Sequence, residues 1–264
     1  MSMKIFDFHL HPGYDFHDND TDPAHFVAIL KADGICGCAG SFINRDMNRR
    51  PAGEFAWRIP QLNRQVWEFQ STCPGFFVPG IHIHPDFPEL SCKEMDAHKA
   101  KGGILLGELV SYMMDYRYDH PNLPELLRYA QSLGLVASIH PAGDMALNRA
   151  FLAAAPGMDV VLAHLGGMPN HCLYEDMIAL MRENEHVYVD LSAYGNKHPG
   201  MLRDAVNRVG SERILYGTDF PGSLNEAMQK RYIDYVLCEN LTTGETENIF
   251  YNNAARLLRL PSGE

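Results

Sequence analysis

The sequence predicts an α/β fold, a closed (β/α)8 barrel of the TIM-barrel type, from three observations. Short apolar runs typical of strands alternate with longer segments of helical periodicity along the 264 residues. Several runs are continuously apolar, which is typical of parallel strands buried on both faces. Ionisable residues stand at the ends of these runs, where such barrels gather their catalytic groups. A doubly wound open sheet is the runner-up, but no GxGxxG follows the first strand, so a dinucleotide fold has little support.

The first half of the chain contains four predicted strand–helix units. Asp22 and Gly34 fit the start and the stop of the first helix. The strands are Lys4–Phe8, Ile35–Ile43, Phe76–Ile83 and Gly103–Val110. The helices are Pro23–Asp33, Glu54–Thr72, Pro88–Ala100 and Leu123–Leu133.

The second half repeats the pattern and adds a C-terminal helical extension, Thr243–Leu258. No linker or charge block divides the chain, so residues 1–264 are predicted to form a single domain. The strands are Leu135–Ile139, Asp159–Ala163, Val187–Leu191 and Arg213–Gly217. The helices are Asp144–Ala154, Leu173–Glu183, Met201–Val209 and Leu224–Leu237. The longest irregular stretches, 12–22, 44–53 and 111–122, follow strands and are expected to be loops on the catalytic face.

Composition narrows the classes of function. Lys and Arg total 22 against 33 Asp and Glu, a net charge of −11, which argues against binding to a nucleic-acid backbone. No signal peptide or membrane-spanning run is evident, so we expect a soluble, cytoplasmic protein with a small-molecule substrate. The six cysteines form no CxxC pair and predict no disulfide framework. A homodimer is the commonest assembly for such a chain, and the sequence leaves the oligomeric state open.

Six residues at strand ends form the candidate site. His9 and His11 close the first strand, and their spacing points both imidazoles to the same side. Neutral imidazole is a common metal ligand, although an HxH pair alone is as often two solvated histidines. The other four ionisable groups lie in or directly after other strands. Since a divalent metal would satisfy all of them at once, accidental alignment is improbable. They are Glu108, His140, His164 and Asp219.

These residues together resemble the metal-site pattern of the amidohydrolase superfamily, with His9-x-His11 followed by Glu108, His140, His164 and Asp219. The segment Ile249–Leu260 resembles the closing helix of its amidohydrolase-2 branch. The resemblance covers nearly the whole chain. It implies a (β/α)8 barrel of metal-dependent hydrolases, some of whose members are non-oxidative decarboxylases or lyases.

The resemblance also implies a role for each residue. His9 and His11 would bind the more buried metal, and His140 would be a ligand. Asp219 would bind metal and accept a proton from water, so it is a catalytic candidate. His164 would bind a second metal or act directly on water or substrate. Glu108 looks like the bridging glutamate of TatD-like hydrolases. If it bridges, the site holds two ions, which we favour; otherwise one ion is expected.

Three hypotheses for the function follow. The first is a hydrolase that uses metal-activated water on an ester, amide, lactone or phosphoester bond of a small substrate. The second is a metal-dependent non-oxidative decarboxylase or lyase of a carboxylated ring. The third, a non-catalytic barrel, is weak because every ligand position is intact. Zinc suits a histidine-rich site, although manganese, iron or nickel fit the same ligand types.

Other polar residues follow the strands. A second HxH pair, His82 and His84, could contact substrate or simply end its strand. The loop residues that could contact a substrate are Arg45, Arg49, Arg50, Tyr112, Tyr116, Arg117, Tyr118, Tyr194, Asn196 and Lys197. For Cys36 and Cys38 we expect buried packing.

Overall fold

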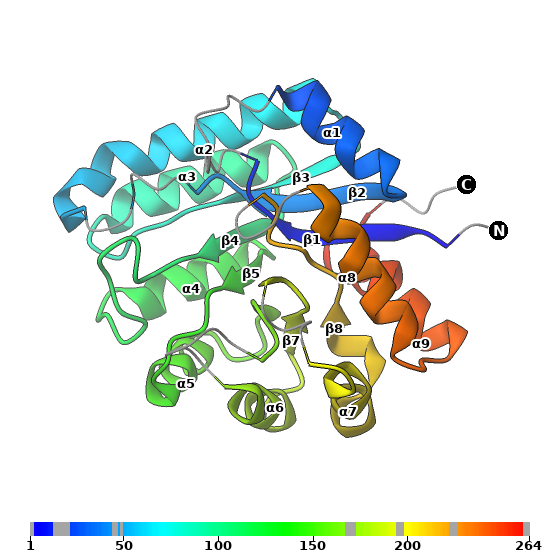
Figure 1. Cartoon of the computed structure of the whole chain (residues 1–264). Coiled ribbons are helices and arrows are strands. Elements are labelled where there is room, and N and C mark those ends of the chain that lie inside the picture. Colours follow the sequence, from blue (N-terminus) through cyan, green and yellow to red (C-terminus); the bar gives the residue numbers. More distant parts are fainter. Residues whose placement is uncertain are drawn as a thin grey trace.

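The structure is a computed structural model that describes residues 3–12, 22–43, 47, 50–166, 173–193, 198–221 and 226–260. Its eight strands lie in the order β1 to β8, each parallel to the next, with the helices around the outside (Figure 1). This arrangement confirms the predicted barrel. The strands are β1 (Ile5–Leu10), β2 (Ile35–Ser41), β3 (Phe77–Ile81), β4 (Leu105–Leu109), β5 (Val136–Ile139), β6 (Val160–Leu162), β7 (Val187–Asp190) and β8 (Ile214–Leu215).

The helices agree with the predicted segments to within a few residues. Their starts follow the expected chemistry, since the side chains of Asp22 and Asp144 cap α1 and α5. They are α1 (Pro23–Ala32), α2 (Phe55–Thr72), α3 (Pro88–Ala100), α4 (Leu123–Ser132), α5 (Met145–Ala154), α6 (Tyr174–Glu183), α7 (Met201–Val209), α8 (Glu226–Cys238), α9 (Thr243–Glu247) and α10 (Asn253–Leu257). Short 3-10 turns lie at η2 (Ala52–Glu54) and η4 (Ser211–Arg213), and a π-helical turn, η5 (Asn248–Asn252), joins α9 to α10.

The barrel closes where the first strand meets the last. The backbone N–H of Phe8 donates to the carbonyl of Tyr216 at 2.9 Å, and that of His11 donates to the carbonyl of Phe220 at 2.8 Å. A parallel bridge between Leu10 and Phe220 extends the contact. The first and last strands, β1 and β8, therefore lie side by side, and we call the line along which they meet the seam. The seam contains His9, His11 and Asp219.

Two apolar clusters pack against the strands, one outside the barrel and one inside it. The larger lies between the strands and the surrounding helices. The smaller, which we call the inner cluster, takes residues from nearly every strand and from α10, so it fills the amino-terminal part of the barrel beneath the catalytic face. Its buried members are Phe6, Phe8, Ala39, Ile104, Leu105, Val136, Val161, Tyr188, Leu215, Ala254, Leu257 and Leu258.

Strand β1 changes facing direction just before its histidines. Phe8 belongs to the inner cluster, whereas Leu10 belongs to the outer one. The pairing of β1 with β2 is shifted between Asp7 and Leu10, which accounts for the change. The strand continues through Leu10 rather than ending at Phe8 as predicted, and both imidazoles of the HxH pair face the barrel mouth.

Close strand packing restricts some positions to glycine. A Cβ on Gly80 of β3 would lie 2.0 Å from the carbonyl oxygen of Gly107 on β4. This close packing of β3 against β4 helps to position the site, because Glu108 directly follows Gly107 in β4.

Within the described residues, no helix has the length and apolarity needed to cross a bilayer. Cys38 is buried as expected, but Cys36 is exposed, because it lies near the start of β2 at the amino-terminal rim of the barrel.

Candidate metal centre

The structure brings all six predicted ligand residues together at the carboxyl ends of their strands. Two sets of three have ligand atoms within 4.8 Å of one another: His9, Glu108 and His164, and His9, His11 and Asp219. His140 joins them, since its Nδ1 lies 3.1 Å from Glu108 Oε1 and 3.2 Å from His164 Nε2. The six side chains therefore lie together in the structure.

The outer hydrogen bonds of His9 and His11 determine which ring nitrogen faces the centre. His9 Nδ1 lies 2.8 Å from Oδ2 of Asp190, and His11 Nδ1 lies 2.9 Å from the carbonyl oxygen of Ser41. Since the carbonyl can only accept and the carboxylate is ionised, each Nδ1 carries a proton. The two Nε2 atoms, 3.1 Å apart, then face each other with lone pairs in the neutral rings. A cation bound by both Nε2 atoms would remove the repulsion between these lone pairs.

The carboxylate of Glu108 faces different groups with its two oxygens. Its Oε2 lies 3.4 Å from Nε2 of both His9 and His11. Its Oε1 lies 3.1 Å from His140 Nδ1 and 3.5 Å from His164 Nε2. Glu108 therefore stands between two groups of ligand atoms. We call the space bounded by His9, His11, Asp219 and Oε2 the first position, and that bounded by His140, His164 and Oε1 the second position.

Backbone conformation turns two of the side chains into the centre. His164 and Asp219 follow β6 and β8 with φ of 64° and 62°, a left-handed conformation that costs non-glycine residues roughly 1–3 kcal/mol. The neighbouring Asp7 supports this segment, because it accepts from the backbone N–H of Thr218 at 3.1 Å and from its hydroxyl at 2.6 Å. Burial raises the pKa of Asp7 to about 7, although these hydrogen bonds act in the opposite direction.

The charges within the centre are strongly coupled. Burial lowers the pKa of His11, but hydrogen bonds to Asp219 and Glu108 outweigh it and raise that pKa to about 9. The pKa of His9 is also raised well above its usual value, because the attraction of Asp190 and Glu108 exceeds the effect of burial. Burial acts to raise the pKa of Glu108, but the attraction of His9 and hydrogen bonds to the other imidazoles hold it well below its usual value. Without a metal, protons would supply the positive charge that a divalent ion can supply.

The geometry of the first position fits one divalent cation. Nε2 of His9 and Nε2 of His11 lie 3.1 Å from each other, 3.4 Å from Glu108 Oε2, and 3.7 and 3.3 Å, respectively, from Asp219 Oδ1. Ligands bonded at about 2.1 Å in a tetrahedral arrangement lie about 3.4 Å apart. Nitrogen and carboxylate oxygen are suitable donors for such an ion, so the cluster is a divalent-metal site.

Two residues of the site were not predicted from the sequence. Asp190 ends β7 and is fully buried, and Ser192 follows it with its hydroxyl 2.8 Å from His164 Nδ1. A carboxylate inside the apolar run VYVDL is the same signal that identified Glu108 in GILLGELV. That signal could have identified Asp190, whereas nothing in the sequence distinguishes Ser192.

The second HxH pair binds backbone rather than joining the metal site. His82 Nε2 donates to the carbonyl of Phe42 at 2.8 Å, and His84 Nε2 lies 2.7 Å from the carbonyl oxygen of Met114. Neither residue belongs to a set of potential metal ligands among the described residues. The geometry favours the hypothesis that these histidines fix the ends of β3 and its neighbours.

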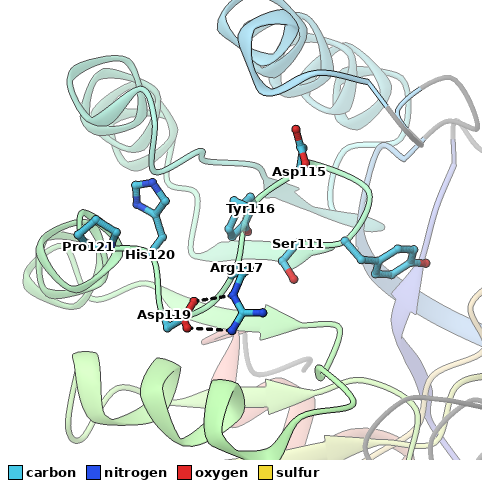
Figure 2. A pocket seen from close by; sticks show the side chains of 8 residues that line it. Ser111, Asp115, Tyr116, Arg117, Asp119, His120 and Pro121 are labelled. Carbon is cyan, nitrogen blue, oxygen red and sulfur yellow. Dashed lines mark hydrogen bonds and ion pairs between the residues drawn. The ribbon is translucent and has the colours of Figure 1, made fainter.

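The loop after β4 lines a pocket of about 520 Å3 (Figure 2). Tyr118 fixes the base of this loop, since its buried hydroxyl lies within hydrogen-bond distance of the carbonyls of Leu109 and His140 at 2.9 and 2.7 Å. Tyr112 connects the pocket to the centre, because its ring centroid lies 5.0 Å from that of His140. The lining residues are Ser111, Tyr112, Asp115, Tyr116, Arg117, Asp119, His120 and Pro121.

The charged groups of this pocket are largely paired. Arg117 makes a two-pronged ion pair with Asp119 at 2.9 and 3.0 Å, which Figure 2 shows at the edge of the pocket. Tyr116 is buried, and its ring lies edge-on to that of His84 with centroids 5.2 Å apart. Five other predicted contact residues lie outside the described part of the chain: Arg45, Arg49, Tyr194, Asn196 and Lys197.

Comparison with known proteins agrees with this fold and site. The model of the amidohydrolase family matches residues 47–260, so the chain belongs to the amidohydrolase family. This confirms the resemblance seen in the sequence. No curated protein sequence matches the chain.

Solved structures share the fold over the full length at low identity. A dihydroxybenzoic acid decarboxylase from Polaromonas sp. JS666, with bound manganese and 2-nitroresorcinol, is 15% identical with a TM-score of 0.74 over 99% of this chain and 98% of its own. A 5-carboxyvanillate decarboxylase from Sphingomonas paucimobilis is 13% identical, with a TM-score of 0.70 over 98% and 99%. An amidohydrolase of unstated substrate from Staphylococcus aureus is 16% identical, with a TM-score of 0.74 over 98% and 100%.

Proposed function

We propose that this protein is a metal-dependent decarboxylase that removes the carboxyl group of a small aromatic acid without an oxidant. The observation that carries the proposal is the division of the site. His9, His11, Asp219 and Glu108 Oε2 suffice for one ion, which leaves His140 and His164 to face a substrate in the second position. The similar structures that act on dihydroxybenzoic acid and 5-carboxyvanillate support this assignment over simple hydrolysis.

The reaction needs one bond broken and one formed. The bond between the ring carbon and the carboxylate carbon breaks, carbon dioxide leaves, and the bonding electron pair remains on the ring carbon. A proton then forms the new C–H bond. A divalent ion at the first position would supply Lewis acidity, which polarises an oxygen of the substrate.

The chain's own residues orient the acid and deliver the proton. Nε2 of His164 faces the second position as an acceptor, so we assign it the transfer of the proton: it first takes a proton from a substrate hydroxyl or from water and then delivers it to the ring carbon. Asp219, with the most exposed side chain of the first position at 17%, would hold the ion and limit access of water. The pocket between Ser111 and Pro121 would hold the rest of the ring, with Tyr112 at the border between pocket and metal centre.

A second candidate is the hydrolase with two ions, and the position of Glu108 favours it. The two carboxylate oxygens face separate ligand groups, as a bridge between two ions requires. In that case the second position holds an ion instead of a substrate group. Asp219 would then accept the proton of the attacking water.

Counting the ions tests both candidates in one protein preparation. The protein is purified without chelator, its zinc and manganese per chain are measured, and it is then assayed for loss of dihydroxybenzoic acid or 5-carboxyvanillate and for hydrolysis of esters and lactones. We expect about one ion per chain and release of carbon dioxide. Two ions with hydrolysis and no carbon dioxide would replace the decarboxylase with the hydrolase.

Glu108→Gln provides a sharper comparison. In the single-ion enzyme the other three ligands remain, so the metal content should stay near one per chain. In the two-ion enzyme the bridge is lost, so the metal content should fall from about two to about one. Asp159→Asn is a matched control, because Asp159 also contacts a histidine, His186 at 3.2 Å, at the opposite end of the barrel.

A further inference from the structure

Asp190 accepts four hydrogen bonds that connect the two halves of the metal centre. Its Oδ2 lies 2.8 Å from His9 Nδ1, next to the first position. Its Oδ1 accepts from the backbone N–H groups of His164 at 3.1 Å and Ser192 at 2.9 Å, and also from the hydroxyl of Ser192. The carboxylate is fully buried, so these donors are satisfied by protein groups and not by solvent.

The single proton of the Ser192 hydroxyl determines the state of His164. Because that proton is donated to Asp190, the Ser192 oxygen has only lone pairs to offer His164 Nδ1, which lies 2.8 Å away. His164 must therefore carry a proton on Nδ1. Its Nε2, which faces Glu108 at 3.5 Å and His140 at 3.2 Å, is left as an acceptor in the neutral ring.

We infer that Asp190 and Ser192 form one positioning unit, which holds both His9 and His164 in the tautomer with the proton on Nδ1. Through this unit, the end of β7 sets the tautomer of one histidine at each of the two metal-centre positions. The inference rests on the proposed metal-dependent function, and it adds residues to which the family resemblance assigned no role. A hydrogen-bonded partner of a ligating histidine commonly changes metal affinity by roughly 10–100-fold.

Replacement of Asp190 by asparagine should reverse the tautomer of His9. Asparagine has one oxygen, and three of the four donors converge on the side of Oδ1. If the oxygen stays there, the NH2 group faces His9 Nδ1 and donates to it. The proton of His9 then moves to Nε2, where it blocks ligation.

Ser192→Ala separates the two effects. It removes the acceptor for His164 Nδ1 but leaves His9 bonded to Asp190 Oδ2. Although Ser192 Oγ also lies 3.2 Å from His9 Nδ1, the shorter contact to the carboxylate remains. Ser192→Thr restores the hydroxyl and serves as the conservative variant. Asp159→Asn again serves as the control at a histidine–carboxylate pair outside the centre.

The experiment measures tautomers and ion affinity, and neither readout needs turnover. Ring 15N shifts of histidine-labelled, metal-free protein report the protonated nitrogen at pH 10, above the raised pKa of His11, with the His164→Gln variant assigning that residue. Affinity for Zn2+ alone is measured by competition with a chelating dye. We expect Asp190→Asn to move the His9 proton to Nε2 and to lower the Zn2+ affinity of the first position roughly 10–100-fold. Ser192→Ala should change the His164 signals, and Ser192→Thr should restore them.

Two results would overturn the positioning unit. One is a native His164 tautomer in Ser192→Ala, and the other is native Zn2+ affinity in a folded Asp190→Asn protein. If Asp190→Asn does not fold, the Ser192 variants still decide, because they change only one side-chain hydroxyl and its hydrogen bonds and leave the buried Asp190 carboxylate in place. If the tautomer and affinity shifts appear but no aromatic acid loses its carboxyl group, the positioning unit stands and only the proposed decarboxylase fails.

Discussion

His9 and His11 point their Nε2 atoms at each other across 3.1 Å, and each Nδ1 is hydrogen-bonded to an oxygen on its outer side. A proton or a metal ion must stabilise this pair of nitrogens. The two compete for the same lone pairs, so acidity and metal binding are linked at the first position.

Metal affinity should therefore rise with pH. In the metal-free protein the pKa of His11 is raised to about 9, because its hydrogen bonds to Asp219 and Glu108 outweigh the opposing effect of burial. Below that pH a bound ion must displace a proton. We expect the Zn2+ affinity to increase about tenfold per pH unit for each displaced proton between pH 7 and 9, and then to level off. Isothermal titration in buffers of different ionisation enthalpy would count the protons, and a pH-independent affinity would contradict the assignment of His11.

Removal of the ion should destabilise the fold. A ligand present at 1,000 times its dissociation constant stabilises the native state by about 4 kcal/mol, which corresponds to a fall in Tm of roughly 10 °C on chelation for a chain of this size. Thermal unfolding with and without a chelator measures the difference. The combined variant His9→Ala, His11→Ala should not respond to the chelator, and an equal response from that variant would show that the ion lies elsewhere.

Gly80→Ala should destabilise the barrel because the added methyl group meets backbone. Its Cβ would lie 2.0 Å from the Gly107 carbonyl oxygen, and neither strand can move without disturbing the pairing of β3 with β4. We expect a loss of about 2–3 kcal/mol in the free energy of unfolding. Gly53→Ala is the matched control, since no atom lies within 4 Å of its Cβ. Urea unfolding compares the two, and equal losses would contradict the close approach.

His98 should make the protein lose stability in acid. It is buried in α3 with its ring edge-on to Trp67, and burial lowers its pKa to about 4. In the unfolded chain its pKa is about 6.5, so the unfolded state binds the extra proton as the pH falls between these values. The stability that His98 contributes is complete above pH 6.5 and declines towards pH 4 by about 3 kcal/mol.

The variant His98→Phe tests this assignment, because phenylalanine keeps a planar ring but cannot titrate. Its free energy of unfolding should fall less steeply than that of the native protein from pH 6.5 to pH 4. The half-buried His186, replaced in the same way, is the matched control outside the core. Parallel slopes for His98→Phe and the native chain would assign the acid sensitivity to other groups.

The barrel could be predicted from the sequence because each strand is an apolar run with a polar end. The ligand residues were visible for the same reason, since Glu108 interrupts an apolar strand and His140, His164 and Asp219 directly follow theirs. Local pattern was sufficient for these residues because the carboxyl ends of parallel strands must meet in a closed barrel.

The supporting contacts could not be predicted in the same way. The hydrogen bond from His11 to the Ser41 carbonyl depends on the register of β1 against β2, and the sequence contains no sign of the shift between Asp7 and Leu10. The use of His82 and His84 to hold backbone carbonyls depends on how the loops after β2 and β4 fold over β3. Such contacts depend on distances between segments far apart in the chain, which residue types alone do not determine.

The seam between β1 and β8 has a consequence for how the protein matures. The first position takes ligands from residues 9 and 11 and from residue 219, so it does not exist until synthesis has passed residue 219 and the barrel has closed. Contacts of such long sequence separation carry a large loop-closure entropy and form late in folding. Metal uptake should thus trail the appearance of helical signal during refolding, and the bound ion should mark only those molecules whose last strand has docked against the first.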